Sequence, residues 1–372
     1  MNKNLKRLFA VSGITLLLAG CIPSLSQEDS LTQETEESQE EVVMIPEVQL
    51  KESYYRTLLP FKKSPVQGLV VNNIYTKYDM KEAEEGLLRL SSQYYSTDDH
   101  FYQEGQYLSE DIVKQWLKRV SADEKGLNPA SSNTGRDEQN PLFLAHIMEQ
   151  NFLKRTSDDK VVVEGITIGL ALNSVYYNLE GKEFPLTDAQ VKAEGEKLAN
   201  EIVKRMREEL EIQNIPIVVG LFKQQPRNAI VPGTYFAVGK ADKGKTSIGN
   251  WTAIQEEYVL LPTDNTIEKY RDVNMKFKNF KQEVDEYFPS FVNVVGKAFY
   301  KDGDMQQLTI RMPIQFFGTS ELIGFTQHVT GLVQKHFSST NVEVNITSTN
   351  GPEALIVKPA QSDEPFVHIY DY

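Results

Sequence analysis

The fold class follows from Ile166-Thr167-Ile168-Gly169-Leu170-Ala171-Leu172-Asn173-Ser174-Val175-Tyr176-Tyr177, a stretch rich in β-branched and aromatic residues. Together with residues 161–163 it predicts strands. Thr187-Asp188 then marks the start of a helix. The apolar residues of that helix share one face: Val191, Leu198, Ile202, Val203 and Met206. Strands predicted at 215–222 and 229–238 complete a β-α-β-β unit.

A second unit of the same kind is predicted downstream. Strands at 291–299 and 307–317 form a hairpin around Lys301-Asp302-Gly303-Asp304, and a helix runs from Ser320 to about Phe337. Strands at 342–347 and 354–357 pair through an Asn350-Gly351 turn.

The two units share two short stretches of similar sequence. Ile166-Thr167-Ile168 resembles Leu308-Thr309-Ile310, and the stretch from Pro226 to Val231 resembles that from Pro352 to Val357. We interpret the pattern as a diverged duplication; the alternative is chance likeness between short amphipathic strands.

The region before these units is expected to be helical. Helices are predicted at 80–90, at 109–120 after a Ser109-Glu110-Asp111 cap, and at 141–153, with a loop at 126–140. A long helix at 267–287 would join the two units. Its apolar stripe indicates core packing rather than a ligand site: Tyr270, Val273, Phe277, Phe280, Val284 and Tyr287. The predicted class is α+β.

The N-terminus has the pattern of an export signal with a lipid-attachment site. Lys3, Lys6 and Arg7 precede an apolar run at 8–18, and Leu18-Ala19-Gly20-Cys21 ends that run at the only cysteine of the chain. We expect cleavage between Gly20 and Cys21 and lipid on the Cys21 sulfur. The alternatives are a plain signal peptide and an uncleaved anchor.

Composition narrows the class of protein further. Removal of residues 1–20, which carry three positive charges and no negative charge, would change the net charge from −13 to −16. Such an acidic chain argues against nucleic-acid binding and makes lipid, not a basic patch, the expected membrane anchor. A single cysteine excludes intrachain disulfides.

Four segments are expected along the chain. Residues 22–41 contain seven acidic and no basic residues, which predicts disorder. The predicted division is a signal peptide at 1–20, an acidic disordered tether at 21–50, an N-terminal α+β domain at 51–264 and a C-terminal α+β domain at 265–372.

The short motif matches in this chain give little support for a catalytic, phosphate-binding or metal site. The stretch from Gly239 to Thr246 fits G-x-x-x-x-G-K-T, but turn-forming residues follow it, so we expect a surface loop. Ser157 and Lys160 fit S-x-x-K without companion motifs, which favours a turn. The five histidines lack zinc-site spacing: His100, His146, His328, His336 and His368. No metal, cofactor or catalytic residue is predicted.

Several stretches resemble the CamS family of Gram-positive lipoproteins, the sex-pheromone precursors. They are Tyr55-Arg56-Thr57-Leu58-Leu59-Pro60-Phe61-Lys62, Gly126-Leu127-Asn128-Pro129, residues 165–177, Ile323-Gly324-Phe325-Thr326-Gln327 and Val367-His368-Ile369-Tyr370. The resemblance implies a folded body without an established activity. It also implies a short hydrophobic peptide, cut from the signal sequence, that acts as a secreted signal for plasmid transfer.

In this chain that peptide would be Ile14-Thr15-Leu16-Leu17-Leu18-Ala19-Gly20. The family's peptide has an aromatic residue and ends in Ala or Ser, whereas this one has Thr15 and three leucines and ends in Gly20. A receptor that reads side-chain shape would register that difference. The alternative is a signal segment that is degraded after use.

The sequence therefore predicts a non-enzymatic lipoprotein on the extracellular face of a Gram-positive membrane. Its expected partners are the membrane through Cys21, lipoprotein-processing enzymes and a receptor for the released peptide, with no nucleic acid. One alternative is a binding module for cell-wall material or another protein, with Tyr54-Tyr55, Tyr94-Tyr95 and Tyr176-Tyr177 lining a groove. A surface hydrolase is another.

Overall fold

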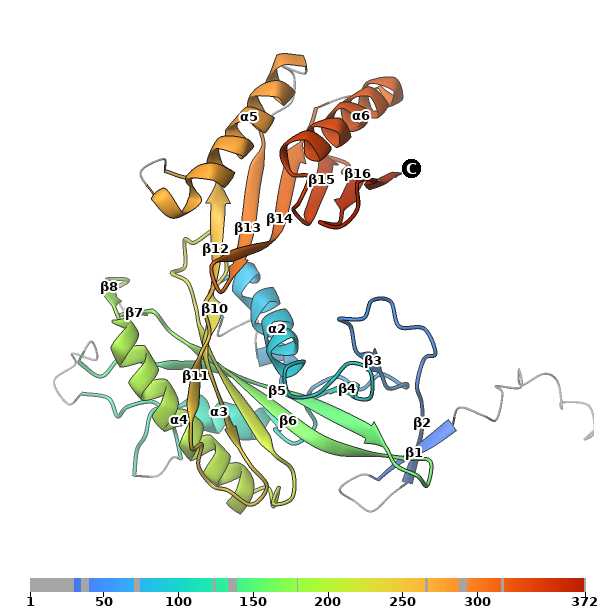
Figure 1. The fold of residues 1–372 in the computed structure, drawn as a ribbon. Coiled ribbons are helices and arrows are strands. Elements are labelled where there is room, and N and C mark those ends of the chain that lie inside the picture. The colour runs from blue at the N-terminus through green and yellow to red at the C-terminus, as the bar shows by residue number, and fades with distance from the viewer. Residues whose placement is uncertain are drawn as a thin grey trace, which may run out of the picture.

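The computed structural model describes residues 30–34, 40–69, 74–122, 125–132, 139–178, 180–264, 267–287, 293–315 and 318–370. Two sheets, each with its own helices, follow one another along the chain (Figure 1). This arrangement confirms the α+β class. Within the described residues, no helix combines the length and apolarity needed to cross a membrane.

The first sheet has the strand order β11-β10-β9-β6-β5-β4-β3. Its strands are β3 (Arg56–Thr57), β4 (Phe101–Glu104), β5 (Leu144–Arg155), β6 (Lys160–Leu172), β9 (Ile217–Lys223), β10 (Thr234–Ala241) and β11 (Trp251–Ala253). Helices α3 (Glu110–Leu117) and α4 (Asp188–Glu208) cover one face, and α2 (Lys77–Ser91) covers the other. A hairpin of β7 (Val175–Tyr177) and β8 (Glu183–Pro185) lies outside this sheet.

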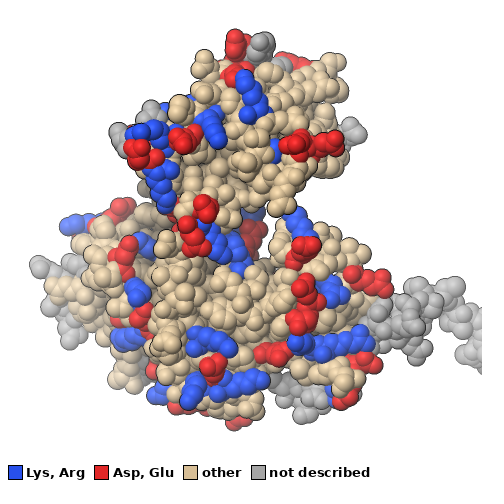
Figure 2. Space-filling view, viewed as in Figure 1, with Lys and Arg blue, Asp and Glu red and all other residues tan. Residues whose placement is uncertain are grey.

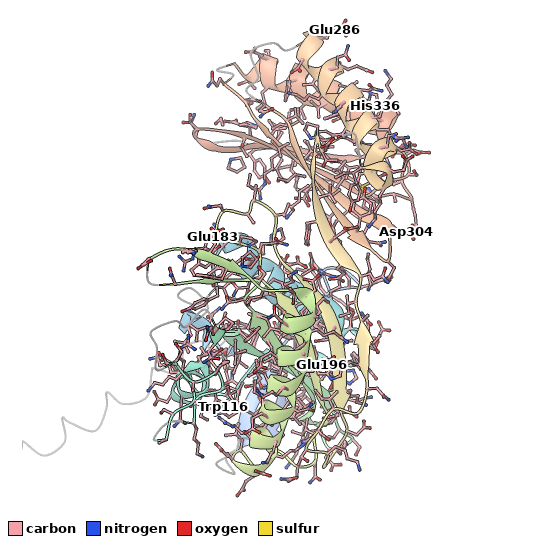
Figure 3. All side chains as sticks on the ribbon, turned by 90° about the vertical axis from the view of Figure 1, so that its left-hand side faces the viewer. Trp116, Glu183, Glu196, Glu286, Asp304 and His336 are labelled. Atoms are coloured by element: carbon pink, nitrogen blue, oxygen red, sulfur yellow. The ribbon has the colours of Figure 1, made fainter. Side chains whose placement is uncertain are left out.

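The second sheet has the order β12-β13-β14-β15-β16-β17. Its strands are β12 (Glu256–Leu261), β13 (Val295–Lys301), β14 (Asp304–Pro313), β15 (Val342–Ser348), β16 (Gly351–Lys358) and β17 (Phe366–Ile369). Helices α5 (Arg271–Tyr287) and α6 (Thr319–His336) pack on one face and enclose a single core. In Figure 3, Glu286 and His336 mark these helices, whereas Asp304 lies on the side toward the first sheet.

The two units share one order of elements. The first runs β4-α3-β5-β6-α4-β9-β10-β11 and the second β12-α5-β13-β14-α6-β15-β16-β17. The parallel pairing of β6 with β9 begins at Ile166 with Ile217, and that of β14 with β15 begins at Leu308 with Val342. Both predicted β-α-β-β units are therefore present, and the likeness of Ile166 to Leu308 falls at equivalent positions.

The second sequence match, between residues 226–231 and 352–357, does not fall at equivalent positions of the two units. Pro352 lies inside β16, but residues 226–231 precede β10, which begins only at Thr234. The strand predicted at 229–238 was therefore placed too early. The extra length is a connection whose Gly233 N–H is bound by Asp79.

The helix predicted at 141–153 is wrong, because residues 144–155 form β5. This strand pairs with β4 and β6, and its residues from Leu144 to Leu153 are all buried. A strand covered by helices on both faces loses the alternation of apolar and polar residues, so periodicity cannot separate it from a buried helix.

The other helices form where local signals predicted them. Ser109 caps α3, and Thr187 and Gln190 make a reciprocal capping box at the start of α4. Phe277, Phe280 and Val284 of α5 are completely buried in the second core, which confirms the packing role of that stripe. Helix α5 thus belongs to the second unit and packs against α6.

Candidate functional site

The predicted site residues Gly20 and Cys21, and the candidate peptide at 14–20, lie outside the described residues. Their roles stay predictions. The described chain nevertheless shows how the body begins, because its first elements are β1 (Ser30–Glu34) and β2 (Glu40–Met44).

Strands β1 and β2 form an antiparallel pair that is attached to the first sheet. Ser30 pairs with Met44 at one end and Glu34 with Glu40 at the other. Strand β1 also runs parallel to the start of β6, where the Thr32 N–H donates to the Asp159 carbonyl at 3.1 Å.

Apolar contacts hold this pair in place. Leu31 and Val43, each 2 % exposed, complete a small core with Phe101, Leu153 and Val161. The buried amides of Gln33 and Gln103 donate to each other at 3.1 and 3.2 Å.

The predicted tether at 21–50 is therefore wrong for residues 30–34 and 40–44. Acidic composition predicts disorder only when too little apolar surface is buried, and two inward-facing side chains reverse that balance here. Residues 21–29 and 35–39 of the predicted tether lie outside the described residues.

The chain after β2 stays close to the first sheet. Met44 and Leu59 exchange two backbone hydrogen bonds of 2.8 Å. The Gln49 amide donates to the Tyr54 carbonyl at 2.8 Å, and the Thr97 hydroxyl donates to the Glu52 carbonyl at 2.6 Å. Residues 45–59 are thus fixed by specific bonds.

The three tyrosine pairs do not line one groove. The Tyr55 hydroxyl donates to the Tyr95 carbonyl at 2.6 Å, and the Tyr95 ring stacks on Phe152 at 4.8 Å in the core under α2. Tyr177 lies elsewhere, beneath the Arg227 guanidinium at 4.0 Å. The binding-module alternative loses the feature that suggested it.

The G-x-x-x-x-G-K-T stretch begins inside β10, and its residues 242–246 form the turn after that strand; β11 follows, so the expected surface loop is confirmed for this part of the stretch. Gly244 has a φ of 74°, a conformation that favours glycine. Buried Arg207 donates to the Asp242 and Lys245 carbonyls, each at 3.1 Å. Its guanidinium is therefore committed to holding the turn.

The S-x-x-K stretch is the turn between β5 and β6, as expected. The Thr156 N–H donates to the Lys160 carbonyl at 2.8 Å, and Asp159 adopts a φ of 57°. Ser157 donates to Asp158 at 3.2 Å, not to an amine.

The histidines are dispersed. His146 is completely buried in β5, where burial lowers its pKa to about 4. His336 contacts Glu283 at 3.1 Å between α5 and α6. No group of three potential metal ligands occurs among the residues with described positions.

A polar cluster joins the two units, and we call Glu82, Arg89, Glu256 and Tyr258 the junction cluster. Arg89 of α2 donates to both oxygens of Glu256 at 3.0 and 2.8 Å and also to Glu82. The Tyr258 hydroxyl completes the cluster by donating to Glu82. Charged side chains of both signs meet where the two units touch (Figure 2).

The junction cluster is largely shielded from water. The side chains of Glu82 and Glu256 are each 5 % exposed, and the Arg89 guanidinium lies 4.6 Å from the centre of the Phe299 ring. Burial raises the pKa of Glu82, and the charge of Arg89 opposes this effect. Sequence analysis missed the cluster because no local motif links residues so far apart in the chain.

The chain is similar to known proteins over most of its length. The family model for the CamS sex pheromone cAM373 precursor matches residues 61–364. A sex pheromone precursor from Lactobacillus salivarius subsp. salivarius is 26 % identical, with a TM-score of 0.82, covering 89 % of this chain and 99 % of the other. No curated protein matched.

A second solved structure agrees with the first. The C-terminal domain of the sex pheromone staph-cAM373 precursor from Staphylococcus aureus is 32 % identical, with a TM-score of 0.68, covering 81 % of this chain and 99 % of the other. The family match covers the chain from before α2 to after β16, which is most of both sheets, and the chain therefore belongs to the CamS family of sex pheromone precursors.

Proposed function

We propose that this chain is made as a precursor that is cut between Gly20 and Cys21 and held by lipid on Cys21 at the extracellular face of a Gram-positive membrane. The segment from Ile14 to Gly20 is then released as a signalling peptide. The observation that carries the proposal is membership of the pheromone-precursor family in a chain whose only cysteine follows Leu18-Ala19-Gly20.

The chemistry of both products is consistent with these roles. Two acyl chains contribute about 0.8 kcal/mol for each buried CH₂ group, which is enough to retain the body without a membrane-spanning helix. The peptide is uncharged and mostly apolar, so it suits an apolar receptor pocket. Processing enzymes and that receptor are the partners the proposal requires.

The proposal assigns no chemistry to the folded body. Support comes from the two stretches that match catalytic or phosphate-binding motifs. The Ser157 hydroxyl donates to Asp158 within a turn, and the glycine-rich turn is held by Arg207, which donates to its Asp242 and Lys245 carbonyls. These groups have structural partners, and the family is described by its peptide product.

Mass spectrometry of the culture supernatant tests peptide release. We expect a peptide that ends at Gly20 from the natural chain and none from Cys21→Ala, because cleavage requires lipid on that sulfur. Ser24→Ala, just beyond the cleavage site, is the matched control and should release the same peptide. Absence of any peptide ending at Gly20 from the natural chain would refute the precursor role.

Detergent-phase partitioning tests the anchor separately. The natural chain should enter the detergent phase with the mass of a lipidated chain beginning at Cys21. If Cys21→Ala partitions in the same way with mature mass, the lipid assignment is wrong.

A further inference from the structure

Exposed apolar side chains are concentrated between positions 42 and 61, in β2 and in the chain that follows it. Val42, Val48 and Leu50 are 64, 72 and 81 % exposed, and Tyr54 and Phe61 are each 50 % exposed. We call these five residues the anchor-side patch. Soluble surfaces expose single apolar residues routinely, but a concentration of large ones indicates a contact surface.

The charge of this stretch differs from that of the whole chain. Residues 42–63 contain four basic residues, Lys51, Arg56, Lys62 and Lys63, and two acidic residues, Glu47 and Glu52, whereas the chain carries −13. The Lys51 ammonium lies 5.2 Å from the centre of the Tyr54 ring. Aromatic rings beside lysines are typical of the interface between lipid and water.

The place of the patch in the fold brings it close to the proposed anchor. Ser30, at the start of β1, is nine residues after Cys21, and nine extended residues span at most about 30 Å. Strands β1 and β2 and the chain that follows them occupy one end of the first unit, next to the tip of the β5–β6 hairpin (Figure 1). Helix α4 lies on the opposite side, where Glu196 faces the viewer in Figure 3.

We propose that the anchor-side patch lies in the headgroup region of the lipid bilayer, so that the body meets the membrane with a fixed face. This inference rests on the proposed lipid at Cys21, which keeps the patch near the surface. The lipid supplies most of the affinity. The patch supplies orientation, because the bonds between Met44 and Leu59 and from Thr97 to Glu52 hold its backbone in place.

Fluorescence quenching by brominated lipids tests the orientation. The chain beginning at Cys21 is coupled through its thiol to a maleimide lipid and placed in phosphatidylcholine–phosphatidylglycerol vesicles with brominated acyl chains. Leu50→Trp is compared with Met275→Trp, because Met275 is a 53 % exposed residue on α5 in the second unit. The native Trp116 and Trp251 give a common background.

We expect strong quenching of the tryptophan at position 50 and none beyond background at position 275. Equal quenching at both positions, or none at position 50, would overturn the proposal. Because the lipid is coupled chemically, failure of natural lipidation does not affect this result; natural lipidation is judged from the mass of the chain extracted from cells.

A second measurement uses the chain that begins at Ile22, without any lipid. Cosedimentation with the same vesicles should be weak for the natural sequence and about tenfold weaker for a Val48→Ser, Leu50→Ser, Phe61→Ser variant. The matched variant Ile230→Ser, Met275→Ser removes apolar groups that are 60 and 53 % exposed elsewhere, and it should bind normally. If the patch variant binds vesicles normally but loses a protein partner, the patch is a protein interface and the lipid proposal is wrong.

Discussion

The first and second sheets share one strand order, but they differ in what covers one face. Helices α3 and α4 cover one face of the first sheet, and α5 and α6 cover the equivalent face of the second. Helix α2 covers the other face of the first sheet, whereas it reaches that face of the second sheet through side chains such as Arg89, which lies over the Phe299 ring. Equal topology therefore does not dictate equal packing.

The size of the side chains on that face explains why α2 packs on the first sheet and no described helix covers the second in the same way. Gly169 and Gly220 lie three residues after Ile166 and Ile217, where Tyr235 packs beneath α2. A Cβ on Gly169 would lie 2.6 Å from the Tyr235 hydroxyl oxygen, and one on Gly220 would lie 2.8 Å from the Tyr235 ring. The equivalent positions of the second sheet are Arg311 and Asn345, whose side chains would block a helix at that distance.

Breaking the contact that α2 makes with the second unit should have the largest effect. Arg89→Met leaves the carboxylates of Glu82 and Glu256 close together and shielded, without their cation. Removing one member of a buried ion pair costs about 3 kcal/mol or more. We expect a loss of about 3 kcal/mol in chemical denaturation and faster hydrogen exchange in β12.

The triple variant Arg89→Met, Glu82→Gln, Glu256→Gln is the control for charge. It should recover most of the lost stability, since it removes the unpaired charges along with the pair. A triple variant as unstable as Arg89→Met would show that geometry, not charge, holds the units together.

Acid titration tests a second feature of the first unit, the buried carboxyl group of Asp79 at the start of α2. Burial raises the pKa of Asp79 from 3.8 to about 6, while hydrogen bonds from Gly233 and Thr76 oppose the rise. The folded state thus binds this proton more tightly than the unfolded state. The resulting stability is fully present below pH 3.8 and is lost as the pH rises through about 6.

Denaturation of the natural chain and of Asp79→Asn between pH 4 and 7 measures this contribution. Relative to the variant, the natural chain should lose about 2 kcal/mol as the pH rises. Parallel stability curves for the two chains would contradict the assignment to Asp79.

Filling the space under α2 should have the smallest effect. Gly169→Ala places a methyl group against Tyr235 and Leu87, and overpacking of this size costs about 1 to 2 kcal/mol. Arg311→Ala, at the equivalent exposed position, should change stability by less than about 0.5 kcal/mol. Equal effects in thermal unfolding would mean that glycine does not control the covering of the face.

Local sequence signals predicted much of the fold. Caps at Ser109 and Thr187 placed two helices, and the Asn350-Gly351 pair placed a hairpin turn. Strand β5 was missed because burial on both faces removes periodicity. Strands β1 and β2 were missed because their order depends on Leu31 and Val43 reaching a core formed by distant residues.

The candidate sites also differ in whether neighbouring residues in the sequence are enough to predict them. The lipid site at Cys21 was predicted from adjacent residues alone and stays a prediction, whereas Arg89 and Glu256 meet only after the two units fold. Exposure of Val48 and Leu50 also depends on tertiary structure, since apolar residues in a sequence are expected to be buried. Sequence can identify a processing signal, but it cannot place an interface.

The pairing of β1 with β2 determines how the body responds to mechanical force. A pull on the N-terminal side enters the fold at Ser30, directly opposite Met44, which is itself bonded to Leu59. Force applied at that end would load the Ser30–Met44 pair first, and the parallel pairing of β1 with β6 at Thr32 and Gln33 would resist the separation. We therefore expect β1 to detach from β2 and β6 first, while the pairings among the strands from β3 to β17 remain.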